Sequence, residues 1–168
     1  MKLTLSNPPW IETYTGRRYY PTAPRAEDVC IQDIAHHLSM LCRFTGAVRS
    51  FYSVAEHSVH LARHVPRQYA LAGLLHDATE AYLADMNRPL KHWWGMWGYR
   101  RIEARNWKVI AEHFGIPVAL PGCVKVMDNR MLLAERTALM PATGSVWPFY
   151  EMPADVDIKC WPPAQAER

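Results

Sequence analysis

The sequence predicts an all-α fold, a compact helical bundle with a short irregular or hairpin arm at the N-terminus. Three observations support this prediction. Apolar residues recur at helical spacing through the middle of the chain, glycine and proline interrupt that part at short intervals, and 168 residues suffice to bury a substantial core. We expect a single domain over residues 1–168, with its helical core over about 31–140.

The composition is that of a soluble globular protein and excludes several classes of partner. Hydrophobic residues make up 49% of the chain and charged residues 21%. The net charge of +3 does not call for a nucleic acid polymer, although it suits an anionic small molecule. There is no run of 18 apolar residues and no signal peptide, so we expect no membrane partner and a cytoplasmic location. The four cysteines show no CxxC spacing and are expected to be ordinary thiols.

The first elements can be placed by their turn and cap residues. The stretch "WIETYTGRRYYP" alternates around Thr15-Gly16, which predicts a short hairpin or an ordered arm. Asp33 is suited to cap a helix that runs through "IAHHLSMLCRF" and ends near Gly46. Ser53-Val-Ala-Glu56 has the capping-box pattern, so a second helix is expected from about Val54 to His64.

The later elements follow the same reasoning. Pro66 suits the first turn of a long third helix over 68–84. Apolar spacing predicts a fourth helix over 98–115 that ends at Gly115, and a last helix over about 124–139. The proline-rich residues 141–168 are expected to form an irregular packed arm that frays at "PPAQAER".

The stretch "LLHDATE" places three ionisable residues in an apolar helix. His76 and Glu80 are four residues apart and share a helix face, while Asp77 lies about 100° round the helix from His76. Burying ionisable groups costs on the order of several kcal/mol unless they are paired or bind a metal. A half-exposed surface helix is the alternative explanation.

Two other predicted helices supply the same residue types. His57 lies among small and apolar residues of "SVAEHS", and Asp128 interrupts the apolar positions of "KVMDNRMLLAE". Either could instead lie on a solvated helix face. Together with His76 and Asp77 they offer two imidazoles and two carboxylates, a set that suits one divalent transition metal: Mn, Fe, Co, Ni or Zn. Four ligands leave coordination positions open for water and substrate.

The order His57 … His76-Asp77 … Asp128 resembles that of the HD-domain metal-dependent phosphohydrolases over roughly residues 33–140. The segments "CRF", "SVAEHS" and "HDATEAYLADMNRPLK" are similar to those of the bacterial 5′-deoxynucleotidases and the phage dATP triphosphohydrolases. The resemblance implies a compact HD-domain helical bundle. It also implies a single metal, because Glu80 and Asp85 stand where members with two metals carry additional histidines.

The resemblance further implies roles for residues around the metal. Arg43 matches an arginine that contacts phosphate, Glu80 matches the catalytic acid or base, and Asp85 matches an aspartate that contacts the deoxyribose. Among the implied substrate-binding residues, Phe44 can lie against the base. Pro89 and Lys91 are the two others, and they shape the sugar and phosphate pocket.

The implied reaction is hydrolysis of the 5′-phosphoester of a deoxynucleotide, with dATP giving deoxyadenosine and triphosphate. Three alternatives remain open: a 5′-deoxynucleotidase that acts on dNMPs, a cyclic-nucleotide or (p)ppGpp hydrolase, and a non-catalytic nucleotide-binding module. Relatives form dimers or hexamers, so a homo-oligomer is expected, with the tryptophan-rich stretch 93–107 as a contact. The expected location is the cytoplasm, which is that of the host if a phage encodes the chain.

Overall fold

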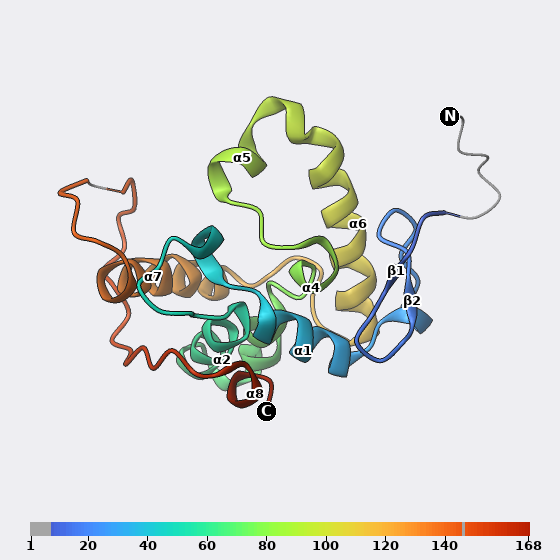
Figure 1. Ribbon diagram of the computed structural model, residues 1–168, viewed down its shortest axis with the longest axis horizontal. Coiled ribbons are helices and arrows are strands. Elements are labelled where there is room, and N and C mark those ends of the chain that lie inside the picture. The colour runs from blue at the N-terminus through green and yellow to red at the C-terminus, as the bar shows by residue number, and fades with distance from the viewer. Residues whose placement is uncertain (1–7, 146) are drawn as a thin grey trace.

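The computed structural model describes residues 8–145 and 147–168, which form a mostly helical fold (Figure 1). The part of the N-terminal arm before residue 8 lies outside the described residues. The helices are α1 (Ile31–Met40), α2 (Val54–His64), α3 (Ala70–Leu75), α4 (Glu80–Leu83), α5 (Arg88–His92), α6 (Trp97–His113), α7 (Gly122–Leu139) and α8 (Pro163–Ala166). Shorter 3₁₀ turns are η1 (Ala26–Asp28), η2 (Arg43–Gly46), η3 (Arg67–Tyr69) and η4 (Trp94–Met96).

The N-terminal arm contains the expected hairpin. Strands β1 (Ile11–Glu12) and β2 (Arg18–Tyr19) pair antiparallel, and Gly16 takes a φ of +77° at the turn. Both Thr15 donors, the backbone N–H and the hydroxyl, bind the carboxylate of Asp33 at 2.7 and 3.0 Å. Asp33 lies inside α1, after the N-cap position at Cys30, so the predicted cap at Asp33 is wrong. The Asp33 side chain anchors the hairpin instead. Its oxygens serve a contact distant in sequence instead of the helix terminus.

Helix α2 begins and ends where the capping box predicts. The Ser53 hydroxyl accepts a hydrogen bond from the backbone N–H of Glu56 at 3.0 Å. The Glu56 carboxylate, however, is fully buried and accepts the backbone N–H groups of Lys159, Cys160 and Trp161 at 3.0, 2.9 and 2.6 Å. These bonds fix the C-terminal arm to α2.

The end of the arm does not fray as predicted. Residues Pro163–Ala166 form α8, which packs against α1 and α2. Ala166 is buried, and Glu167 pairs with His36 of α1 at 3.1 Å. The apolar and acidic side chains of "PPAQAER" thus have partners that the local sequence does not reveal.

The long third helix predicted over 68–84 is also wrong. Helix α3 ends at Leu75, and α4 begins at Glu80 after a tight turn. Within this turn the N–H groups of Ala78 and Glu80 donate to carbonyls three residues earlier, both at 2.9 Å. The ring of His76 bonds the Gly73 carbonyl at 2.8 Å and so competes for an acceptor of the helix ladder. The turn places the His76-Asp77 pair beside α2.

Helix α2 lies between the two parts of the hydrophobic core. At its N-terminal end Val54 joins a cluster with α1, α3, α4 and α6, and towards its other end Leu61 joins a cluster with α7. Burying each such side chain contributes about 1.5–3 kcal/mol. Helices α2 and α3 approach closely at Gly73, where a Cβ would come within 2.8 Å of the Leu61 side chain.

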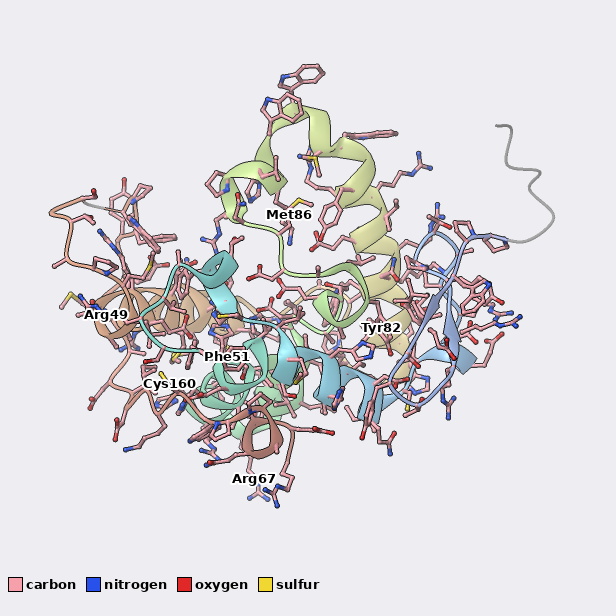
Figure 2. The ribbon with its side chains drawn as sticks, in the orientation of Figure 1. Arg49, Phe51, Arg67, Tyr82, Met86 and Cys160 are labelled. Atoms are coloured by element: carbon pink, nitrogen blue, oxygen red, sulfur yellow. The ribbon has the colours of Figure 1, made fainter. Side chains whose placement is uncertain are left out.

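Helices α6 and α7 confirm the last two predicted helices, and Gly115 follows α6 with a φ of +65°. Helix α5 was not predicted; Asn87 caps it by accepting the Leu90 N–H at 3.0 Å. Figure 1 shows α5 and the start of α6 extending away from the other helices, and Figure 2 places Met86 on the segment that leads to α5.

Among the described residues no helix combines the length and the apolar character needed to cross a membrane.

Candidate metal centre and adjoining pocket

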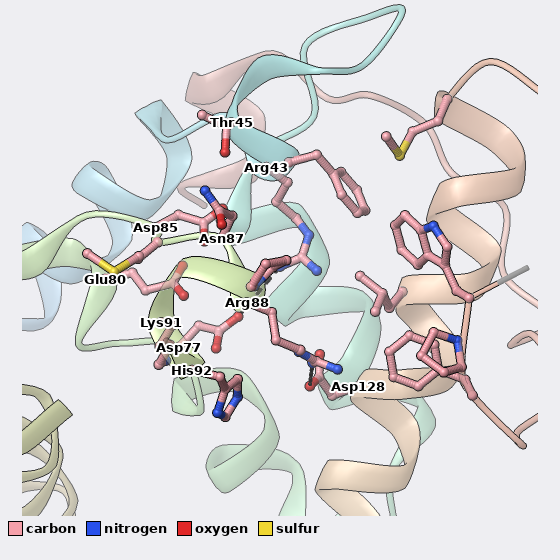
Figure 3. A pocket seen from close by; sticks show the side chains of 18 of the residues that line it. Arg43, Thr45, Asp77, Glu80, Asp85, Asn87, Arg88, Lys91, His92 and Asp128 are labelled. Carbon is pink, nitrogen blue, oxygen red and sulfur yellow. Dashed lines mark hydrogen bonds and ion pairs between the residues drawn. The ribbon is translucent and has the colours of Figure 1, made fainter. Parts of the chain in front are cut away.

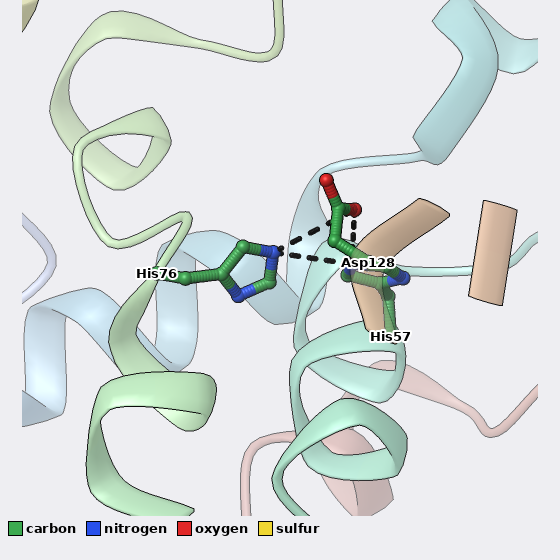
Figure 4. A group of neighbouring side chains, drawn as sticks. All are labelled: His57, His76 and Asp128. Carbon is green, nitrogen blue, oxygen red and sulfur yellow. Dashed lines mark hydrogen bonds and ion pairs between the residues drawn. The ribbon is translucent and has the colours of Figure 1, made fainter. Parts of the chain in front are cut away.

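Three side chains from separate parts of the fold meet at one point. His57 comes from α2, His76 from the turn after α3, and Asp128 from α7, and one ligand atom of each lies within 4.8 Å of the others (Figure 4). The two Nε2 atoms are 3.3 Å apart, and Asp128 Oδ1 lies 3.5 Å from His57 Nε2 and 4.0 Å from His76 Nε2. Ligands bound at about 2.1 Å to one metal ion are separated by roughly 3–3.5 Å. The three residues could therefore hold a metal ion.

Hydrogen bonds fix how the two imidazoles face this point. The Nδ1 of His57 lies 2.5 Å from Glu135 Oε1, and the Nδ1 of His76 lies 2.8 Å from the Gly73 carbonyl. Both partners are acceptors, so each Nδ1 carries the proton and each Nε2 of a neutral ring presents its lone pair to the cluster. Two ring nitrogens and a carboxylate oxygen that face one another favour a positive charge between them, supplied either by a metal ion or by a proton on one imidazole.

The electrostatics of the cluster show the same preference for positive charge. Burial and Arg43 act to lower the pKa of His57, but Glu135 and Asp128 outweigh them and raise it to about 9. Burial acts to raise the pKa of Asp128, yet the two histidines and Lys125 hold it well below its usual range. Without another cation, the histidine ring thus retains a proton to balance the carboxylates.

Asp77, the fourth predicted ligand, lies beside the cluster. Its Oδ2 is 3.1 Å from His76 Nε2 and 3.8 Å from His57 Nε2, and it also faces Arg43 at 3.6 Å. Burial acts to raise the pKa of Asp77, but the histidines outweigh it and lower that pKa. The carboxylate is thus ionised and within reach of both imidazoles, while the group of three mutually close ligand atoms is made by His57, His76 and Asp128.

Glu135 is a functional candidate that sequence reasoning missed. It is fully buried, and besides His57 it binds Arg43 Nε at 3.1 Å and accepts from the Tyr52 hydroxyl at 3.0 Å. Burial acts to raise its pKa, but Arg43 and His57 outweigh burial and lower it. A signal was present: Glu135 follows Asp128 by seven residues, two helical turns, and so lies on the same face of α7.

Arg43 reaches the site from η2, an irregular segment. The backbone N–H of Arg43 donates to the Tyr52 carbonyl at 2.9 Å. The next two residues, Phe44 and Thr45, both have a φ of +55°. This left-handed backbone conformation is unusual for residues other than glycine, and it persists only where the surrounding structure enforces it. The guanidinium is buried between Glu135 and Asp77, whose negative charges raise its pKa against the effect of burial.

A pocket of about 670 Å³ adjoins the cluster, with Asp128 belonging to both (Figure 3). Eight of the ten predicted site residues line it: Arg43, Phe44, Asp77, Glu80, Asp85, Pro89, Lys91 and Asp128. The other two, His57 and His76, are not among the residues that line it. The sequence-predicted constellation is thus brought to one place, although its parts come from α2, α4, α5, α7 and irregular segments between them.

Glu80 is the acid with the most unusual surroundings in the pocket. One of its carboxylate oxygens, Oε2, is buried without a hydrogen-bond partner among the described residues. Burial, together with the negative charges of Asp77 and Asp85, raises the pKa of Glu80 well above its usual range. Burial also raises the pKa of Asp85. Glu80 is therefore suited to hold a proton at neutral pH.

The pocket also gathers two cations that the sequence analysis did not single out, Arg88 and Lys125, beside the predicted Lys91. Arg88 and Lys125 lie 3.5 and 2.7 Å from Asp128 Oδ2, and Lys91 pairs with Glu103. Figure 3 shows Arg43 and Arg88 among the carboxylates of the pocket. The arrangement favours an anionic ligand placed against the candidate metal ligands.

Comparisons with known proteins identify relatives that match most of the chain. No family model matches the chain. The chain is 41% identical over 142 residues to the uncharacterized protein YfdR of Escherichia coli strain K12, covering 84% of this chain and 79% of the relative. An uncharacterized protein of Rhodobacter capsulatus is 38% identical over 125 residues, which span 69% of this chain and 63% of that protein. Identity at this level over most of both chains means that the protein belongs to the family of YfdR.

Proposed function

We propose that this protein is an HD-type metal-dependent phosphohydrolase that cleaves the 5′-phosphoester of deoxynucleotides, with dATP giving deoxyadenosine and triphosphate. The observation that carries the proposal is the meeting of His57, His76 and Asp128 beside a pocket that holds a buried acid and several cations. The order of these residues in the chain, with Asp77 next to His76, is the order that the HD enzymes share.

The donor set fits one divalent transition metal, namely Co, Mn, Zn, Ni or Fe. His57, His76 and Asp128 would hold it with Asp77, since imidazole nitrogen and carboxylate oxygen are the ligands that such ions share. When bound, the ion supplies Lewis acidity and lowers the pKa of a water molecule.

The chain's own residues then account for charge and protons. Arg43 neutralises charge that develops on the phosphate, and Glu80 carries the proton. In the net reaction water adds across the bond between the α-phosphorus and O5′. The hydroxyl goes to phosphorus, the bond to O5′ breaks, and O5′ receives the proton.

The number of cations favours a triphosphate over a monophosphate. Arg88, Lys91 and Lys125 line the pocket in addition to Arg43, and in the free protein each is paired with a carboxylate. A triphosphate carries enough negative charge to engage all four, whereas one phosphate group engages fewer. A 5′-deoxynucleotidase with the same centre remains the second candidate.

The sugar contacts follow from two residues at the entrance to α5. Asp85 is proposed to accept a hydrogen bond from the 3′-hydroxyl, and Pro89 to crowd the 2′ position. A ribose hydroxyl without room or partner costs about 1–3 kcal/mol, so dATP should exceed ATP in kcat/KM by roughly 10–100-fold.

The test is product analysis on a panel of dNTPs, NTPs and dNMPs, with phosphate, pyrophosphate and triphosphate resolved. We expect EDTA to abolish hydrolysis, Mn²⁺ or Co²⁺ to restore it, and dATP to release triphosphate. His76→Ala should lose both the ion and the activity. Asp157→Ala, a change at an exposed acid that pairs with Lys159, should lose neither.

Each other result has a definite meaning. Hydrolysis of nucleotides that is equally fast with and without EDTA would exclude the proposed centre. Activity on dNMPs alone would assign the 5′-deoxynucleotidase. An equal rate with ATP and dATP would exclude the deoxynucleotide assignment. Bound nucleotide with no turnover in any metal would leave a binding module.

A further inference from the structure

One side of the pocket is apolar. Three aromatic residues form what we call the aromatic wall: Phe44, Trp147 and Phe149. Leu132 and Met140 line the same side. Two of the three wall residues come from the proline-rich segment after α7, which the sequence predicts only as an irregular arm.

The segment that carries the wall is anchored to α7. Arg136 places its guanidinium 4.6 Å from the centre of the Trp147 ring and donates to the Ser145 carbonyl. Arg136 lines a neighbouring pocket, while Trp147 lines the pocket beside the metal cluster. The cation therefore covers the indole from the outside and leaves its pocket side available.

A second set of bonds holds the chain after the wall. Asn129 donates to Glu151 at 2.7 Å, Arg130 donates to the Met152 carbonyl at 3.1 Å, and the Ala154 N–H donates to the Arg130 carbonyl at 3.0 Å. The segment that carries Trp147 and Phe149 is thus held to α7 on both sides, which lowers the entropy cost of using these rings for binding.

The rings of the wall are spaced without stacking on one another. Phe44 and Trp147 have centroids 6.3 Å apart at 48°, and Trp147 and Phe149 are 6.5 Å apart at 53°. All three side chains are partly exposed and line the pocket. Arg43 and Arg88 lie 5.4 Å from the rings of Phe44 and Phe149, respectively, and also reach the carboxylates at the metal cluster. Cations thus connect the wall with the metal cluster.

We propose that the aromatic wall binds the planar base of a nucleotide by stacking, with Trp147 as its central residue. The nucleotide as ligand class rests on the proposed function. The phosphates would face Arg43, Arg88 and the metal cluster, while the base meets the wall. Stacking is tolerant of base identity and grows with ring area, so purine nucleotides bind more tightly than pyrimidine nucleotides.

The test compares ligands with and without a base. Binding of dATP, dCTP and inorganic tripolyphosphate is measured by calorimetry with Mn²⁺ present, in a Glu80→Gln background that slows turnover. Trp147→Ala should weaken dATP about tenfold or more, the range known for loss of one stacking partner, and change tripolyphosphate less than twofold. Trp147→Phe should retain most of the dATP affinity.

Trp94→Ala is the matched control, because that side chain is 79% exposed and does not line the pocket. It should leave all three affinities unchanged. Thermal unfolding of Trp147→Ala, and its intact binding of tripolyphosphate, verify that the variant is folded. Equal loss for dATP and tripolyphosphate, or no loss for dATP, overturns the base-binding role.

The two proposals fail separately. If Trp147→Ala weakens dATP binding but the unmutated protein hydrolyses no nucleotide, the base-binding role is supported and the proposed reaction is wrong. If the protein hydrolyses dATP and Trp147→Ala retains the affinity for dATP, the proposed reaction is supported and the base binds elsewhere.

Discussion

The buried oxygen of Glu80 gives this residue two measurable properties, one in catalysis and one in stability. With its pKa raised by burial and by Asp77 and Asp85, the folded chain retains a proton that the unfolded chain releases. Stability from this group is therefore complete below the unfolded pKa, about 4.3, and is lost as pH rises towards the higher folded pKa. A residue that helps catalysis by holding a proton destabilises the fold at neutral pH.

Glu80→Gln should show both effects. Turnover should fall by roughly 10²–10⁴, the usual range for loss of a general acid or base, while metal and dATP affinity stay within a few-fold. Because glutamine does not ionise, the variant's unfolding free energy should fall less between pH 5 and pH 8 than that of the unmutated chain. Urea titrations at several pH values and single-turnover kinetics measure the two effects. Identical pH slopes would show that the pKa of Glu80 is not raised in the fold.

Residue types alone indicated much of the site. His57, His76 and Asp128 stand out in the sequence because ionisable groups within apolar helices need partners, and the structure brings these three together. Glu135 was missed because an acid flanked by Ala134 and Arg136 is typical of a solvated helix face, although its seven-residue spacing from Asp128 places it on the same face of α7. Only the long-range contacts to Arg43 and Tyr52 reveal that it is buried.

At the scale of elements, α7 serves the candidate centre twice. Its Asp128 is a candidate ligand, and its Glu135, two turns later, holds the ring of His57, the candidate ligand from α2. A carboxylate that receives the second ring N–H of a metal-bound histidine orients the ring and raises its basicity.

Glu135→Gln tests this positioning role. Glutamine retains the size and one acceptor oxygen but not the charge, so metal affinity should fall by about 10–100-fold. Competition with a chromogenic chelator measures the affinity. Glu112→Gln, at an exposed acid of α6 that pairs with Lys108, is the control and should not change it. An unaltered metal affinity in Glu135→Gln would reduce Glu135 to a packing residue.

Helix boundaries were predictable where local chemistry decides them. Ser53 caps α2, and Gly115 ends α6, because each satisfies its helix terminus with nearby atoms. The break between α3 and α4 was not predictable, because the side chain of His76 takes a backbone acceptor only in the folded site. For the same reason Asp33, whose partner Thr15 is 18 residues away, was mistaken for a cap.

At the scale of the whole molecule, the mostly helical architecture followed from periodicity, but the course of the C-terminal arm did not. The arm is held by Glu56, a residue that the capping-box pattern assigns to its own helix terminus. The expected homo-oligomer and cytoplasmic location stay predictions. The exposed side chains of Trp93, Trp94 and Trp97, near α5, remain suited to a subunit contact.

Hydrogen bonds attach the C-terminal arm to α2 and α7, and a bound nucleotide should change how easily a protease cuts this arm. If a nucleotide binds only when the aromatic wall is in place, thermodynamic reciprocity requires the nucleotide to strengthen the attachment of the segment that carries it. Residues 141–145, all exposed, lie on that segment next to Trp147. At a dATP concentration 100-fold above Kd, cleavage there by proteinase K should slow by up to about 100-fold. Trp147→Ala should lose most of this protection at the same concentration, and an arm cut equally fast with and without dATP would show that it does not take part in binding.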